Sequence, residues 1–371
     1  MLNKERLTFI LKYWFLSRVI IIGISLITIN YFPFKPTYPY WQSDLEPLAP
    51  RYLWTWAAFD GAHYLRIAKN GYDAYTQVFF PGYPLLIRLL NPIFNNYLLS
   101  GLLIANLSFI IFLLGLYSLL LRNWPEKLVQ KALKIYLFFP TTFFFNSLYT
   151  ESLFMCLTVL FFNFLDQKHW FKASIMAFLA SLTRVVGIFL GLALLIEWLI
   201  KKGSWSIKGI IYFIVSIFGF LSYLLFLKVN FNNPWLFIKS LSLWEKNKFI
   251  LFPQTFWRYL KMLTMINLGW DKYYLVVLEL IAACLFLYLL IISFRKIKWS
   301  YFIFSCGCFL LPLSTGTFSS LPRYVLILFP LFIILAELLH KNKSLNLIYW
   351  CFSWLMLIIN VFLFVSGEFV S

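Results

Sequence analysis

Long apolar stretches recur along the whole of this sequence and constrain its fold more than any other feature. Stretches near or above about 18 residues, the length that spans the hydrocarbon layer of a membrane, alternate with short polar segments. Of the 371 residues, 62% are hydrophobic and only 12% are charged, which is too little polar surface for a soluble protein. We therefore expect an all-α polytopic membrane protein in which residues 1–371 form a single transmembrane domain.

Short clusters of lysine and arginine separate the apolar stretches and predict the topology. If the clusters near 4–18, 122–134, 168–172, 201–208, 295–298 and 341–343 all face the cytoplasm, the N-terminus is cytoplasmic. An even number of spans then separates each cluster from the next. The pattern predicts about eleven spans, near 15–33, 98–121, 133–149, 151–167, 173–184, 186–200, 209–229, 273–294, 299–313, 324–339 and 346–366.

Composition also argues against two classes of ligand. The net charge of +18 comes from the clusters between spans, a pattern that suits anionic lipid headgroups and not nucleic acid. The five cysteines all lie in apolar stretches, where such residues are usually inert packing groups. The pair Cys306 and Cys308 lacks the further ligands of a zinc site. We expect no disulfide, no metal and no nucleic-acid partner.

Two long connections, residues 34–97 and 230–271, fall on the extracytoplasmic face in this topology. Both are rich in tryptophan, tyrosine and phenylalanine, which are enriched at the membrane interface. We expect short amphipathic helices in these loops, above all in the first, lying on the outer surface of the membrane.

The first outer loop contains an unusual group of polar residues. Asp60, His63 and Arg66 are spaced by three, so a helix would bring them toward one side. His63 is the only histidine predicted on this face. Asp60 is either a helix N-cap, where aspartate is favoured, or a carboxylate that accepts a proton from a hydroxyl. The segment that follows, residues 79–88, contains two prolines and a glycine, which favour either a structural re-entrant turn or a rigid pocket wall.

Three further charged residues interrupt apolar runs near the same face. Glu151 lies between two apolar runs, where a carboxylate is either at the water interface or functional. Arg184 and Arg323 are predicted at the outer headgroup level. Each alone is a typical structural anchor, but two converging arginines would suit a lipid phosphate.

Taken together, these segments resemble the PIG-V family of polytopic mannosyltransferases, members of the GT-C superfamily. The matching stretches occur in the family's order and are residues 59–72, 79–88, 139–154, 180–187 with Glu197, and 322–330. The chain has Phe59 where the family usually has tryptophan, and Gly82 where the family often has a bulky residue. Both departures alter the expected shape of the acceptor pocket.

The resemblance implies a GT-C membrane bundle that moves mannose from a polyprenyl- or dolichyl-phosphate donor to an acceptor hydroxyl, with inversion. Asp60 maps onto the family's proposed general base. In this hypothesis Glu151 is a second catalytic residue that orients the acceptor or tunes the cations, and the donor phosphate is bound by His63, Arg184 and Arg323. The residues expected to form the acceptor pocket are Tyr64, Arg66, Phe80, Pro81, Tyr83, Tyr149 and Tyr324. No cofactor or metal is required, because a monophosphate leaving group carries less charge than a nucleotide diphosphate.

Two other functions compete with this hypothesis. A lipid or lipid-linked sugar flippase would place charged residues along a path through the bilayer midplane, and Glu279 in the eighth predicted span is the main residue of that kind. A non-catalytic partner subunit would keep the fold but lose the charged groups. The acceptor is not identified by the sequence. The abundance of lysine, asparagine, isoleucine and phenylalanine favours a bacterial plasma membrane over the endoplasmic reticulum of a eukaryote.

Overall fold

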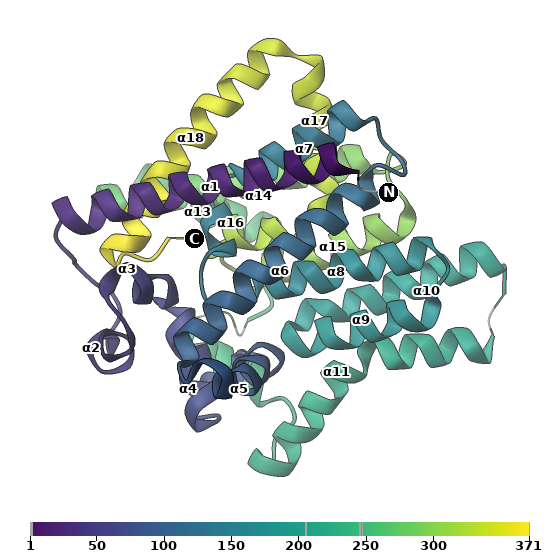
Figure 1. Ribbon diagram of the computed structural model, residues 1–371, viewed down its shortest axis with the longest axis horizontal. Coiled ribbons are helices and arrows are strands. Elements are labelled where there is room, and N and C mark those ends of the chain that lie inside the picture. Colours follow the sequence, from purple (N-terminus) through teal and green to yellow (C-terminus); the bar gives the residue numbers. More distant parts are fainter. Residues whose placement is uncertain (1–2, 205, 245, 247, 371) are drawn as a thin grey trace.

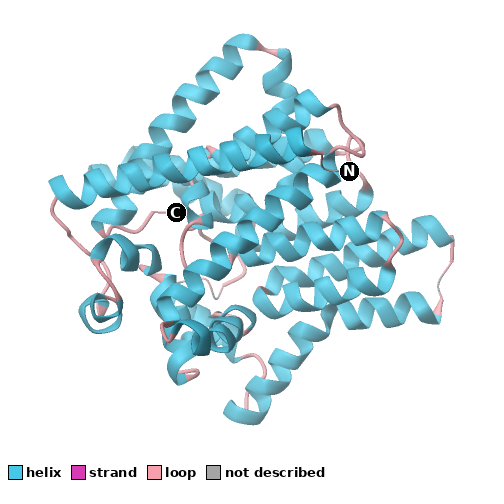
Figure 2. Cartoon of the chain, viewed as in Figure 1, coloured by secondary structure: helices cyan, strands magenta, loops and turns pink. Residues whose placement is uncertain are grey.

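The computed structural model describes residues 3–204, 206–244, 246 and 248–370, and these residues form a bundle of helices (Figure 1). Figure 2 shows helices joined by loops throughout this part of the chain. Five helices are long and apolar enough to cross a membrane: α1 (Lys4–Tyr31), α6 (Tyr97–Leu120), α11 (Ile207–Phe231), α14 (Trp270–Ser293) and α18 (Lys343–Ser366). The protein is therefore an all-α membrane protein, as expected.

The chain between 321 and 341 adds a broken sixth candidate. Here α16 (Leu321–Tyr324) and a 3-10 turn meet α17 (Phe329–Lys341) at an angle of 93°. Several other apolar helices are shorter than a straight span, among them α9 (Trp170–Thr183) and α15 (Trp299–Leu313). The count of about eleven spans therefore stays a prediction.

Asparagine side chains define where three of the long helices begin. Asn3, Asn96 and Asn342 precede α1, α6 and α18, and each side-chain oxygen accepts a hydrogen bond from the backbone N–H three residues later. This cap satisfies one of the amide groups that a helix leaves without an internal partner. Each of the three helices then contains an apolar stretch long enough to cross a membrane.

The predicted third span, residues 133–149, is not one helix. Instead α7 (Glu126–Leu137) ends before Pro140, and a short 3-10 turn, Thr142–Phe145, follows it. Proline disfavours a helical conformation in the residue before it, so the sequence cannot continue α7 through this point. The segment from 138 to 150 is nevertheless fully buried, because α8 (Glu151–Asp166) and its neighbours surround it.

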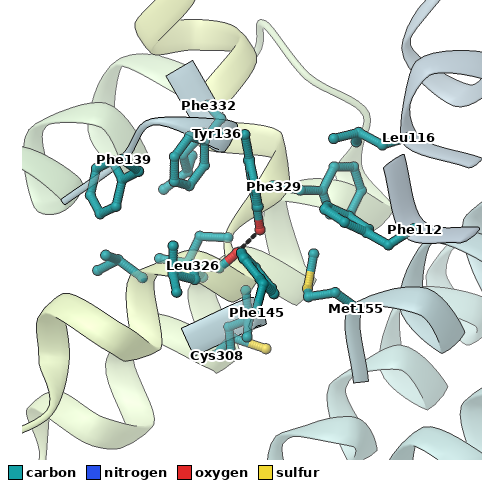
Figure 3. Close-up of a cluster of buried hydrophobic side chains, with 14 of the residues drawn as sticks. Phe112, Leu116, Tyr136, Phe139, Phe145, Met155, Cys308, Leu326, Phe329 and Phe332 are labelled. Carbon is teal, nitrogen blue, oxygen red and sulfur yellow. Dashed lines mark hydrogen bonds between the residues drawn. The ribbon is translucent and has the colours of Figure 1, made fainter. Parts of the chain in front are cut away.

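An aromatic cluster fixes the broken segment against the bend before α17 (Figure 3). The ring of Tyr136 lies 4.3 Å from that of Phe332 and 5.5 Å from that of Phe145, measured between centroids. The Tyr136 hydroxyl donates a hydrogen bond to the backbone oxygen of Leu326, within the turn that precedes α17. The bend that positions residues 321–327 is therefore held from within the core.

Ion pairs join the chain segments that carry the predicted cytoplasmic clusters. Arg6 pairs with Glu126 at 2.8 Å, so the start of α1 meets the start of α7. Asp166, at the end of α8, pairs with Lys298 at 2.8 Å and with Arg122 at 3.8 Å. Three of the six predicted clusters, near 4–18, 122–134 and 295–298, therefore lie close together, which fits the predicted topology. The side of the membrane that they face stays a prediction.

Residues 34–97 fold into a group of short helices away from the N-terminus (Figure 1). They are α2 (Trp41–Asp44), α3 (Arg51–Trp54), α4 (Asp60–Asn70) and α5 (Gly82–Phe94), with 3-10 turns between them. On α5, Leu85, Leu89 and Ile93 are exposed while Tyr83 and Ile87 are buried. The exposed residues repeat every four positions, so one face of α5 is apolar and free. That this face lies on a membrane surface stays a prediction.

Candidate functional site

A cavity of about 790 Å³ opens where the segment 34–97 meets the bundle. Its walls come from α4, the start of α8, the break after α9, the segment 237–249 and the segment 311–327. The charged residues Asp60, Glu151, Arg184 and Arg323 all line it, although they are far apart in sequence. Polar groups converging in an otherwise apolar cavity are the usual form of a substrate site.

These four residues form a continuous row of alternating charge. The Nη1 atom of Arg323 lies 2.7 Å from Oδ2 of Asp60, and its Nε atom lies 3.4 Å from Oε1 of Glu151. The same Glu151 oxygen accepts a hydrogen bond of 2.6 Å from Nη1 of Arg184. Each charge therefore has an opposite neighbour, which buried charges require.

Asp60 occupies the first turn of α4, and its carboxylate does not cap the helix. The N-cap residue is Phe59, whose φ of 56° and ψ of −117° are rare for a residue with a side chain. Such a conformation costs about 1–3 kcal/mol and persists only where its surroundings enforce it. Here the Tyr149 hydroxyl donates to the backbone oxygen of Ala58 at 2.9 Å, and the Phe59 ring packs 4.5 Å from the Tyr38 ring.

The Asp60 carboxyl is ionised at neutral pH. Burial would raise its pKa, but the charge of Arg323 and its hydrogen bond, with smaller contributions from His63 and Lys246, bring the pKa below the ordinary value. Its side chain remains 19% exposed. Oδ2 accepts from Arg323, while Oδ1 has no hydrogen-bond partner among the described residues. One oxygen of an ionised carboxylate is thus available to a molecule in the cavity.

Glu151 is the first residue of α8 and is only 1% exposed. A carboxylate at a helix N-terminus is stabilised by the helix dipole. Its Oε1 atom contacts both arginines, whereas Oε2 finds no hydrogen-bond partner in the described chain. Glu151 therefore links the two cations.

Arg184 lies in the break between α9 and α10 (Ile188–Lys202), and Gly187 makes that break possible. A Cβ atom at Gly187 would lie 2.5 Å from the backbone of Ser181, so only glycine allows the chain to approach so closely. The Nη1 atom of Arg184 also donates to the hydroxyl of Thr150 at 3.0 Å. The arginine is thereby directed back toward the start of α8.

Arg323 is 6% exposed and lies among aromatic rings. Its guanidinium carbon is 5.3 Å from the ring centroid of Tyr149, 5.1 Å from that of Tyr324 and 5.4 Å from that of Phe144. Cation–π contacts of this kind offset part of the cost of burying the charge. The bend anchored by Tyr136 places this arginine opposite Asp60.

His63 lies one turn after Asp60 on α4, and its ring stacks on Phe79 at 4.9 Å. Burial lowers its pKa, although the nearby Asp60 partly opposes this change. The imidazole is therefore neutral at pH 7 and offers a hydrogen bond without a full positive charge.

Nine of the predicted site residues line the cavity: Asp60, His63, Tyr64, Phe80, Tyr149, Glu151, Arg184, Arg323 and Tyr324. The structure does not bring Arg66, Pro81 and Tyr83 to its walls. Successive residues of a helix are about 100° apart around its axis, so the side chains of Asp60 and Arg66, six positions apart, leave the helix in directions that differ by about 120°. Arg66 pairs with Asp44 at 2.6 Å instead. Pro81 precedes α5, and the fully buried Tyr83 donates its hydroxyl to the Gly101 oxygen at 2.9 Å.

Lys246 also lines the cavity, although no sequence pattern distinguishes it. Its Nζ atom donates to the backbone oxygen of Ser319 at 2.9 Å and lies 5.2 Å from the ring centroid of Tyr324. One lysine among several in the long loop 230–271 carries no distinguishing pattern. Its approach to the site is visible only in three dimensions.

The described residues contain no group of three or more histidine, cysteine or acidic side chains placed to hold a metal ion. Asp60 and Glu151, the acidic residues lining the cavity in this part of the chain, are each paired with arginine. The expectation that the reaction needs no metal or other cofactor stays a prediction.

Apolar helices surround a cavity that combines paired charges with aromatic walls. These features define the class: an integral membrane protein with an internal cavity. The mannosyltransferase (PIG-V) family model matches residues 6–202, more than half of the chain, and the protein belongs to this family. The match includes Asp60, Glu151 and Arg184 and ends before Arg323. No curated protein matches the chain significantly. The family supports a membrane mannosyltransferase and thus confirms the resemblance found in the sequence.

Proposed function

We propose that the protein transfers mannose from a polyprenyl- or dolichyl-phosphate carrier to an acceptor hydroxyl, with inversion, in the cavity beside Asp60. The observation that carries this proposal is the state of that carboxylate. It is ionised, held at one oxygen by Arg323 and without a partner at the other among the described residues. A general base needs this combination of fixed position and free oxygen.

In the proposed step, Oδ1 of Asp60 accepts the proton of the acceptor hydroxyl as the hydroxyl oxygen attacks the anomeric carbon of mannose. The bond from that carbon to the phosphate oxygen breaks, and the lipid phosphate leaves with the electron pair. Attack opposite to the leaving group inverts the configuration, so a β-linked donor gives an α-linked product. The cations of the cavity stabilise the developing negative charge without reorganisation.

The remaining residues divide into two roles. Glu151 keeps Arg184 and Arg323 in place through one oxygen, while its other oxygen is buried without a hydrogen-bond partner in the described chain. His63, as a neutral imidazole, donates a hydrogen bond to the donor phosphate. Four aromatic residues shape the sugar and acceptor pocket: Tyr64, Phe80, Tyr149 and Tyr324.

Exposed apolar residues at the cavity support a lipid-linked donor. Ile238, Phe249 and Leu311 line the cavity and are 41%, 79% and 39% exposed, respectively. Such residues suit the isoprenoid chain of a carrier that enters from the bilayer. We place the site at the extracytoplasmic face of a bacterial plasma membrane, or at the lumenal face if the protein is eukaryotic. This orientation rests on the basic clusters, which meet at the ends of α6, α8 and α15.

The test compares glycolipids and glycoproteins from cells that express the protein with those from cells that lack it. Mass spectrometry is expected to find one species that loses a hexose when the protein is absent, and that species identifies the acceptor. In proteoliposomes supplied with an extract of acceptors, radiolabelled polyprenyl-phosphate mannose is expected to lose its label to the same species. Movement of the labelled lipid across the bilayer without transfer would instead establish the flippase alternative.

A further inference from the structure

The charges that line the cavity do not balance. Asp60 pairs with Arg323, and Glu151 pairs with Arg184. Lys246 and Lys248 line the same cavity, and neither forms an ion pair within the described chain. The positive charge that remains available to an anionic ligand therefore resides on the lysines and not on the arginines.

Lys246 has the more defined position of the two lysines. Its ammonium group has three hydrogen-bond donors, of which one is used by the Ser319 oxygen at 2.9 Å. Its charge acts on Asp60, whose pKa it helps to lower, so it lies close enough to influence the proposed base. Two donors and an uncompensated charge thus lie beside the reacting groups.

The surface on which Lys246 rests is held by a buried polar network. The Tyr259 hydroxyl donates to Glu279 and accepts from the backbone N–H of Phe318 at 2.9 Å. It also lies 3.2 Å from the Thr317 hydroxyl oxygen. The segment 317–319 is thereby anchored to α13 (Phe252–Met265) and α14, and the backbone oxygen of Ser319 is fixed. This network gives Glu279, which is buried in a predicted span, a structural partner.

A second set of contacts ties the other end of the same loop to this wall. The backbone N–H of Ile250 donates to the Ser314 oxygen at 2.8 Å, and the N–H of Lys246 donates to the Leu241 oxygen at 3.1 Å. The Ile250 bond joins the chain after Lys246 to the cavity wall, and the Ser319 oxygen holds the ammonium group itself at that wall. A positioned charge of this kind loses less entropy on binding than a flexible one.

We propose that Lys246 is the cation that binds the phosphate of the lipid-linked donor, next to the hydrogen bond from His63, while Arg184 and Arg323 serve to hold Glu151 and Asp60. The proposal rests on the proposed function. The charge of each arginine is already compensated by a carboxylate within the cavity, so neither arginine offers a phosphate a net positive charge. The charge of Lys246 is not compensated in this way within the described chain. The ammonium also stabilises the leaving phosphate, whose negative charge grows as the bond to mannose breaks.

The test measures the Kd of purified protein in nanodiscs for a polyprenyl phosphate and for the matching polyprenol, which lacks the phosphate. Lys246→Met keeps the apolar stem over Tyr324 and removes the charge. We expect it to raise the Kd for polyprenyl phosphate by about 10- to 100-fold, the value of a charged hydrogen bond. The Kd for polyprenol is expected to stay unchanged, which also shows that the variant is folded. Lys246→Arg should recover most of the affinity.

Lys239→Ala is the matched control, because Lys239 is exposed in the same long loop and does not line the cavity. Its affinity is expected to equal that of the wild type. Binding of polyprenyl phosphate by Lys246→Met within about twofold of the wild type would overturn the assignment, as would an equal loss in the Lys239 control. If the wild type itself does not prefer the phosphate over the polyprenol, the lipid-phosphate donor of the proposed function is what fails.

Discussion

Replacement of Asp60 by asparagine removes the proposed base and nearly preserves the size and shape of the side chain. Asparagine has nearly the same size, and its carbonyl oxygen can still accept the hydrogen bond that Arg323 donates at 2.7 Å. The variant loses the negative charge and, with it, the ability to take a proton. We therefore expect donor binding to persist while mannose transfer fails.

General-base assistance contributes about 10²- to 10⁴-fold to a rate, which corresponds to about 3–5 kcal/mol in the barrier. We expect Asp60→Asn to lower kcat by that factor. The affinity for polyprenyl phosphate is expected to stay equal or to rise, because Arg323 loses its ionised partner and the cavity gains positive charge. The assay follows transfer from radiolabelled donor in proteoliposomes and measures binding separately in nanodiscs.

Asp44→Asn provides the control within the same loop. Asp44 pairs with Arg66 at 2.6 Å, and neither residue lines the cavity. This variant breaks an ion pair of comparable length and is expected to retain transfer. Near-normal transfer by Asp60→Asn, together with an unfolding temperature like that of the wild type, would refute the assignment of the base. If Asp60→Asn unfolds, Asp60→Glu is tested instead. Glutamate keeps the negative charge but moves the carboxylate oxygens, so this variant is expected to fold and still to transfer mannose more slowly than the wild type.

Three further predictions concern stability. Gly187→Ala is expected to cost about 1–3 kcal/mol, because the new methyl group would lie 2.5 Å from the backbone of α9, whereas Gly23→Ala, with open space around it, should leave the melting temperature unchanged. Arg184→Ala leaves the buried Glu151 without its closest partner and should destabilise the protein by about 3–5 kcal/mol in denaturant titrations. Folding lowers the pKa of Asp60, so the ionised carboxylate stabilises the folded protein at pH values above the ordinary carboxyl pKa. This stabilisation is lost as the pH falls through the lowered pKa, and melting curves of Asp60→Asn should depend less on acid pH.

Five long helices of the fold could be predicted from the sequence, because apolar length dominates local structure in a membrane. The predicted spans 98–121 and 209–229 correspond to α6 and α11 within a few residues. The prediction failed where a proline outweighed hydrophobicity, as at Pro140, which separates α7 from the buried 3-10 turn. Helix α13 lies in the loop 230–271, where short amphipathic helices are expected, but the aromatic-rich composition of the loop does not define where this helix begins and ends.

At the site, sequence reasoning found the charged residues but not their partners. Glu151, Arg184 and Arg323 could be identified because a charged side chain within an apolar run is costly and is usually functional. The pairing of Asp60 with Arg323 joins residues 263 positions apart and depends on the bend before α17, which no local pattern encodes. Lys246 could not be identified, because a lysine in a loop between membrane spans is common and only the folded structure brings this one to the cavity.

The row of alternating charges is better explained by chemistry than by stability. Removing two ions of opposite charge from water costs several kcal/mol for each, and buried pairs are often no more stabilising than apolar residues of the same size. A bundle that required only stability would gain nothing from four charged residues around one cavity. The row does, however, keep Asp60 ionised and in place, with one oxygen open to the cavity. Because its own charges cancel in pairs, the row would leave the electrostatic attraction of the proposed anionic donor to the lysines beside it.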